Sequence, residues 1–202
     1  MAKLIRTRPL AGIATAVQPA LPSQVKLEAM PYRAMVNLRL EAEATHVSLL
    51  NATLQIDLPM KANTTIQGSG PRCLWLGPDE WMVSSEAQTG TALVASLSET
   101  LGSTHHSAKD LSDNYTTLRL SGAKARDVLS KLTPLDVHQR VFTTGQCAQT
   151  VMAKSNVILD MISDGADGPC FEMSLRRSFA AYVWARLVDA GLEFGLEVPD
   201  AD

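Results

Sequence analysis

Stretches with a two-residue hydrophobic period and stretches with a helical period follow one another along this chain, and their order constrains the fold more than any other feature. The run NLRLEA from Asn37 alternates apolar and polar residues, and so does Ala52 to Leu58. Such alternation predicts half-buried strands. Cys73 to Leu76 and Glu80 to Ser84 then flank a Gly-Pro turn and are predicted to form a hairpin.

A helix is predicted after this hairpin. Leu93, Leu97 and Leu101 recur every four residues, which places them on one face of a helix. Thr91 is the expected N-cap, and Gly102 stands where a left-handed C-terminal cap is common. The first half of the chain therefore reads as strands followed by one helix.

The second half repeats this succession, with CFEMSLRRS in the place that CLWLGPDEWMVSS has in the first half. Its last helix is expected to be capped by Ser178 and closed by Gly191. The expected elements, in the order strand, helix, hairpin, strand and helix, are Thr117 to Leu120, Ala125 to Leu132, Cys147 to Ala153 with Val157 to Ile162, Phe171 to Leu175, and residues 179–190.

These elements predict an α+β protein built from two similar units, each a mostly antiparallel sheet covered by helices on one face. The first unit is expected over residues 36–105 and the second over residues 106–202. Because no disordered linker separates them, they are expected to pack as one body. Residues 1–35 are expected to form an extended N-terminal arm, since Pro9, Pro19 and Pro22 interrupt any continuous helix or signal-peptide core.

Composition excludes several classes of protein. The 202 residues are 46% hydrophobic and 19% charged with a net charge of −3, which is typical of a globular chain and unfavourable for nucleic acid. No apolar run approaches the roughly 20 residues of a membrane span. Cys73, Cys147 and Cys170 lie far apart without a CxxC pair, which favours a reducing cytoplasm.

A metal site is one interpretation of His105 and His106, which are followed by Asp110 and Asp113. Imidazole and carboxylate groups are ordinary metal ligands. Neighbouring side chains on a strand point to opposite faces, however, and nothing completes a known ligand spacing. We expect exposed polar residues here and no metal.

The other motifs in the sequence give little indication of a catalytic or binding site. Arg176 and Arg177 stand at a strand-to-helix junction, where guanidinium groups hold either an anion or a surface ion pair. Gly68-Ser69-Gly70 is too short for a phosphate loop. Neither GxSxG nor GxGxxG occurs, so the sequence predicts no catalytic residue and no cofactor site by a recognisable motif.

Two of the three tryptophans, Trp75 and Trp81, lie six positions apart in CLWLGPDEWMVSS. One interpretation is a platform on which a flat cofactor stacks, with Asp79 and Glu80 at its polar edge. The other is architecture, in which a hairpin places its indoles in the core or in a subunit contact, where tryptophan is enriched. We favour the second interpretation.

Four segments in order carry a family resemblance. The segments CLWLGPDEWMVSS, LSDNYTTLRLSGAKARDVLSKLTPLDVH, GQCAQTVMAKSNVIL and FEMSLRRSFAAYVWARLVDAG closely resemble the gamma subunits of bacterial heterotetrameric sarcosine oxidases. The resemblance covers roughly residues 36–195, and the first 30 or so residues carry none of it.

The resemblance implies membership of a complex that demethylates sarcosine to glycine with O₂, giving H₂O₂ and, with tetrahydrofolate, methylenetetrahydrofolate. It implies that FAD, FMN, NAD, tetrahydrofolate and zinc are held by partner subunits named alpha, beta and delta. It also implies a fold similar to part of the folate-binding aminomethyltransferases, with no cofactor in this chain.

We therefore expect a non-catalytic structural subunit, without a catalytic, cofactor or metal site of its own. Its candidate interface residues are Trp75, Trp81, Arg176 and Arg177, together with the N-terminal arm. The alternative is a folate-dependent aminomethyltransferase acting on its own, for which carboxylates are available at Asp79, Glu80, Asp136 and Asp160.

Overall fold

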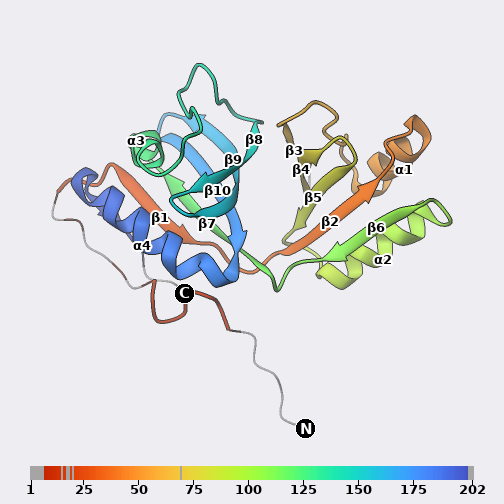
Figure 1. Ribbon diagram of the computed structural model, residues 1–202, viewed down its shortest axis with the longest axis horizontal. Helices are drawn as coiled ribbons and strands as arrows, with labels where there is room; N and C mark the ends of the chain where they lie inside the picture. Colours follow the sequence, from red (N-terminus) through yellow and green to blue (C-terminus); the bar gives the residue numbers. More distant parts are fainter. Residues whose placement is uncertain (1–6, 15, 17–18, 20, 69, 200–202) are drawn as a thin grey trace, which may run out of the picture.

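Figure 1 shows a computed structural model of the chain, which describes residues 7–14, 16, 19, 21–68 and 70–199. Within these residues, the strands are β1 (Val25–Ala29), β2 (Ala34–Leu40), β3 (Thr65–Gln67), β4 (Arg72–Gly77), β5 (Glu80–Ser85), β6 (His106–Asp110), β7 (Tyr115–Ser121), β8 (Cys147–Met152), β9 (Ser155–Gly165), β10 (Gly168–Arg176) and β11 (Leu196–Glu197). The α-helices are α1 (Ala44–Leu54), α2 (Gly90–Leu101), α3 (Ala125–Ser130) and α4 (Ala180–Gly191).

The strands form two sheets. The five-stranded sheet has the order β3-β4-β5-β2-β6, and all its neighbouring strands are antiparallel. The six-stranded sheet has the order β11-β1-β7-β10-β9-β8, and its one parallel pair joins β1 to β11. The predicted α+β class with mostly antiparallel sheets is confirmed.

Each sheet carries its helices on one face, as predicted (Figure 1). In the five-stranded sheet, Val36 and Leu38 of β2 share a buried cluster with Leu50 of α1 and Leu97 of α2. In the six-stranded sheet, β7 and β10 pack in the same way against α3 and α4. The faces without helices turn toward each other and meet in a third cluster, formed by Met35, Leu74, Met82, Cys147 and Ile158.

The helix predicted from Leu93, Leu97 and Leu101 is α2, and all three side chains are buried. Its N-cap is Thr89, whose side chain accepts a hydrogen bond from the backbone of Ala92. Thr91, the predicted cap, lies inside the first turn because α2 begins at Gly90, two residues before the start that a cap at Thr91 implies. Gly102 ends the helix with a positive φ of 54°, a backbone conformation that glycine adopts without strain.

The prediction of a strand over Ala52 to Leu58 was wrong. Its first residues are the last turn of α1, which ends at Leu54 and is followed by Gln55 in the left-handed conformation. Leu50 and Leu54 are spaced one helical turn apart and are both buried in the cluster that contains α2. Burial of that pair selects the helix, although the local alternation also suits a strand.

The strand pairing differs from the predicted division of the chain at two places. β1 lies within the predicted arm yet pairs with β7 of the six-stranded sheet, and β6 lies within the predicted second unit yet pairs with β2. The chain therefore crosses between the sheets twice. Residues 30–33, between β1 and β2, form the first crossing, and residues 111–114, between β6 and β7, form the second.

Candidate functional site

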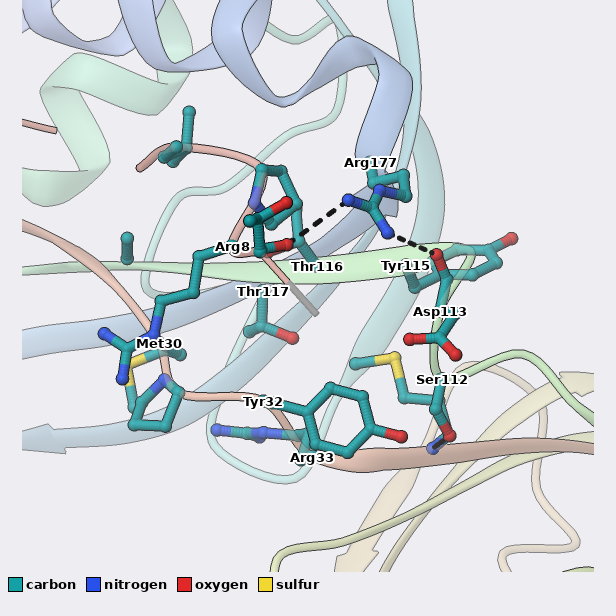
Figure 2. A pocket seen from close by; sticks show the side chains of 16 residues that line it. Arg8, Met30, Tyr32, Arg33, Ser112, Asp113, Tyr115, Thr116, Thr117 and Arg177 are labelled. Carbon is teal, nitrogen blue, oxygen red and sulfur yellow. Dashed lines mark hydrogen bonds between the residues drawn. The ribbon is translucent and has the colours of Figure 1, made fainter. Parts of the chain in front are cut away.

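The two crossings meet at a cavity of about 190 Å³. It is lined by four separate parts of the chain, shown in Figure 2. The lining consists of Thr7 to Leu10 of the N-terminal segment, Ala29 to Arg33 with Met35 from the first crossing and the strands beside it, Ser112, Asp113 and Tyr115 to Thr117 from the second crossing and β7, and Arg177 from the turn before α4. Because junctions between units are common places for ligands, this cavity is the candidate site.

The N-terminal segment closes one side of the cavity, and Arg177 holds it there. The Arg177 guanidinium donates to the carbonyl oxygens of Thr7 and Asp113, both at 3.3 Å (Figure 2). Leu10 is 4% exposed and belongs to the core of the six-stranded sheet. The predicted arm therefore contacts the rest of the chain at Thr7 and Leu10, and residues 1–6, 15, 17–18 and 20 of the arm lie outside the described residues.

A buried carboxylate, Glu172 of β10, lies between two arginines beside the cavity. Arg33 Nη1 donates to Glu172 Oε2 at 2.7 Å, and Arg119 Nη2 donates to Oε1 at 2.6 Å. Burial alone would raise the pKa of Glu172, but the two guanidinium groups outweigh it, so this pKa is lowered from its ordinary value. Glu172 is thus ionised and ties the first crossing to the six-stranded sheet.

A second buried ion pair joins the two sheets away from the cavity. Arg72 of β4 forms a two-point pair with Asp160 of β9, in which the Nη2 to Oδ1 distance is 2.8 Å. Burial raises the pKa of Asp160, although Arg72 opposes the shift. Asp160 and Glu172 both project from the face of the six-stranded sheet that has no helix, and the five-stranded sheet and the first crossing cover that face.

The predicted tryptophan pair is brought together, but it does not line the cavity. Trp75 and Trp81 are opposite each other in the β4–β5 hairpin, on the face that packs against α1 and α2. Trp81 is 0% exposed, and its Nε1 donates to the carbonyl of Pro59 at 2.9 Å. Trp81 is therefore a core residue with no surface for a partner, whereas Trp75 is half-buried.

The predicted arginine pair lies just before α4, where Arg176 ends β10 and Arg177 begins the 3₁₀ turn that leads into the helix, and both residues are exposed. The Arg176 guanidinium lies 5.9 Å from the centre of the Tyr115 ring. The backbone N–H of Arg177 donates to Asn114 at 2.9 Å, so it is not open to an anion. Of the predicted interface residues, the structure brings only Arg177 to the cavity.

His106 and Asp110, two of the four residues considered as metal ligands, have other partners. The His106 ring is hydrogen-bonded to the Thr104 carbonyl at 2.7 Å, and Asp110 accepts from the backbone of Ser112 at 2.9 Å. His105 is exposed. Among the described residues, no group of three or more His, Cys, Asp or Glu side chains is placed to bind a metal.

The four carboxylates considered for a transferase are dispersed. Asp79 pairs with Arg39 at 3.1 Å, and Glu80 accepts from Asn37 at 2.7 Å, both at the end of the β4–β5 hairpin. Asp136 accepts from the backbone of its own loop, and Asp160 lies between the sheets. An enzyme that binds a pterin needs acids that converge on one pocket, and these four acids do not.

Sequence reasoning missed Arg33, Arg72 and Glu172. A signal for the acids is present in the sequence, because Asp160 in VILDMI and Glu172 in CFEMSL are single charges inside apolar strands. Such charges are buried only when paired. Their arginine partners lie 88 and 139 positions away, and no local pattern identifies them.

Helices offer no membrane crossing in the described part of the chain, since none of them is both long enough and apolar enough. Comparisons with known proteins give a consistent result. Residues 41–193 match the family described as "Sarcosine oxidase, gamma subunit family". The chain is 30% identical over 194 residues to a protein named sarcosine oxidase subunit gamma from Corynebacterium sp. (strain U-96), and the alignment covers 94% of this chain and 92% of that protein.

Two solved structures are similar in fold. One is a chain of the heterotetrameric sarcosine oxidase from Corynebacterium sp. U-96 in complex with pyrrole 2-carboxylate, with a TM-score of 0.81, 29% identity, and coverage of 94% of this chain and 96% of that one. The other is the glycine cleavage system aminomethyltransferase T from Bartonella henselae, with a TM-score of 0.63 and 15% identity. This chain matches 46% of the transferase, so that likeness concerns the fold of about half of it.

Proposed function

The chain belongs to the sarcosine oxidase gamma subunit family, and from this premise we propose that it is a non-catalytic structural subunit of a heterotetrameric sarcosine oxidase. Its role is to stabilise and position the subunits that carry flavin and folate. One observation carries the proposal: 94% of this chain aligns with 96% of a chain from such a heterotetramer at a TM-score of 0.81. The match is to a whole subunit and not to a shared domain.

The reaction of the complex is the oxidation of sarcosine with tetrahydrofolate and O₂ to glycine, methylenetetrahydrofolate and H₂O₂. In this proposal, the alpha, beta and delta subunits hold FAD, FMN, NAD, tetrahydrofolate and zinc, and this chain holds none of them. The assembly is cytoplasmic. The dispersed acids support this division of labour, because an enzyme site needs acids that converge on one pocket.

A positioning subunit has to be rigid, and the contacts between the two sheets support this. The pairs Arg72–Asp160 and Arg33–Glu172 are both largely buried. A backbone hydrogen bond from the N–H of Thr65 to the carbonyl oxygen of Gly145, at 2.9 Å, adds to these contacts. Since truncating one partner of a buried ion pair is strongly destabilising, motion that separates the sheets is costly.

The start of α4 is the surface that we propose for a partner subunit. Arg176 and Arg177 are exposed there, and Phe179 and Tyr182 are 44% and 38% exposed. Aromatic residues and arginine are enriched where interfaces are buried most deeply. Trp75 remains a second proposed contact because it is half-buried, while Trp81 is assigned to the core.

The test is co-expression with the alpha, beta and delta subunits, followed by native mass spectrometry. We expect one copy of this chain in the assembly. The double substitution Arg176→Ala with Phe179→Ala should deplete the chain from it, whereas Leu192→Ser, at the other end of α4 and 56% exposed, is the matched control and should assemble normally. A chain that stays apart from all three partners would remove the proposed role.

The alternative is an aminomethyltransferase that acts on its own, and the shared fold is the observation that favours it. Titration of the purified chain with tetrahydrofolate separates the two hypotheses. The structural role predicts no saturable binding and no flavin absorbance. A tight folate complex, or peroxide production from sarcosine by this chain alone, would instead establish an enzyme.

A further inference from the structure

We propose that the cavity at the two crossings is a binding site for a small monocarboxylate anion. This inference concerns the chain by itself, so it stands or falls independently of the proposed structural role. It starts from Arg33, which lines the cavity and whose side chain is 9% exposed.

Arg33 has one donor that the protein leaves without an acceptor. Its Nη1 and Nη2 donate to Glu172 at 2.7 and 3.3 Å, and Nη2 also lies 3.1 Å from Oε1 of Glu86. Its Nε is buried and has no hydrogen-bond partner among the described residues. An unpaired donor of a buried charged group is costly. Arg33 lines the cavity, and a small side-chain shift that brings a ligand oxygen to Nε would remove that cost.

The lining also favours negative charge. Among the described residues that line the cavity, three are arginines, Arg8, Arg33 and Arg177, and one is a carboxylate, Asp113. Figure 2 shows Arg177 entering from the start of α4 and Arg33 from the first crossing, on different sides of the cavity. Guanidinium groups make their strongest hydrogen bonds to oxyanions. The ligand that fits this lining is therefore an anion.

The size and polarity of the cavity restrict which anions can bind in it. The volume of about 190 Å³ is far above the ~10–15 Å³ that one water molecule requires and below that of sites for drug-sized ligands. Much of the wall is apolar, from Pro9, Leu10, Met30, Pro31 and Met35. Glu172 and Glu86 already balance much of the charge on Arg33. A single negative charge with a short apolar tail suits this environment better than a phosphate dianion.

The test is calorimetric titration of the full chain with sodium acetate, sodium butyrate and inorganic phosphate at matched ionic strength. We expect saturable binding of one carboxylate per chain, tighter for butyrate than for acetate, and weaker binding of phosphate. Arg33→Lys keeps a positive charge near Glu172 but cannot supply both sets of hydrogen bonds, so it should weaken butyrate binding about tenfold or more.

Two further variants make the result decisive. Ala29→Leu should abolish butyrate binding by filling the cavity, because Ala29 lines it and carries no charge. Arg39→Lys, in an exposed ion pair with Asp79, is the matched control and should bind as the unaltered chain does. Circular dichroism establishes folding, and if Arg33→Lys does not fold, Ala29→Leu decides. Absence of saturable carboxylate binding, or binding that Ala29→Leu leaves unchanged, would overturn the site, and tighter phosphate binding would overturn the proposed class.

Discussion

Arg72 and Asp160 face each other across the space between the two sheets, although 88 positions separate them in the chain. Their side chains are 11% and 4% exposed, so the ion pair is shielded from water. Two hydrogen bonds fix the guanidinium against the carboxylate. Because of this ion pair, the interior between the two sheets contains charged side chains as well as apolar ones.

Asp160→Asn should destabilise the chain by about 3–5 kcal/mol, because it leaves the charge of Arg72 buried without a counter-charge. The free energy of unfolding in urea measures the effect. Asp79→Asn is the control, since Asp79 and its partner Arg39 are 54% and 53% exposed, and an exposed ion pair contributes at most about 1 kcal/mol. Equal effects of the two substitutions would contradict the assigned burial.

Glu172 should make the free energy of unfolding depend on pH in the acid range. Its pKa in the folded chain is lowered from the ordinary value of 4.5, so the unfolded state takes up the proton first as the pH falls. The stabilisation from Glu172 is therefore fully present above about pH 4.5 and is lost as the pH falls through the lowered pKa.

The measurement for this prediction is the free energy of unfolding of the unaltered chain and of Glu172→Gln at a series of pH values. Asp160 has a raised pKa, to which Glu172 contributes, and it gives a slope of the opposite sign, so the difference between the two proteins reports Glu172 together with its effect on Asp160. That difference should be largest near neutral pH and should shrink in acid. A difference that is constant with pH would disprove the assignment.

The two tryptophans of the hairpin should respond differently to truncation. Trp81→Ala should cost about 3–5 kcal/mol, because it empties a buried site of large volume and removes the hydrogen bond to Pro59. Trp75→Ala should cost about 1–2 kcal/mol, since that indole is half-buried. Thermal unfolding of the isolated chain compares them, and a larger loss for Trp75→Ala would reverse the two roles.

The cysteines should differ in reactivity. Burial raises the pKa of both Cys73 and Cys147 to about 12, so at neutral pH only roughly one molecule in 10⁵ carries either thiolate. Cys170 is partly exposed, although burial raises its pKa too. Alkylation of the folded chain followed by peptide mass spectrometry should label Cys170 first, and labelling of all three at one rate would contradict this order.

Much of the fold could be predicted because its signals are local. The hairpin around Gly77 follows from two alternating runs and a turn, and α2 follows from three leucines one turn apart. Alternation along β10 also correctly predicts that Met173 and Leu175 lie on the face of the strand opposite Glu172. Where two local patterns competed, as over Ala52 to Leu58, the sequence did not decide, because burial of Leu50 and Leu54 against α2 is a tertiary effect.

The candidate site could not be predicted in the same way. Its lining comes from the N-terminal segment, two crossings and the start of α4, and the crossings exist only because β1 joins β7 and β6 joins β2. By itself, the sequence determined which residues share a face of each strand, since that follows from a local period of two. Only the tertiary structure decided that Glu172 and Asp160 are covered and paired with distant arginines, because which surface lies over a face depends on contacts that no local period records.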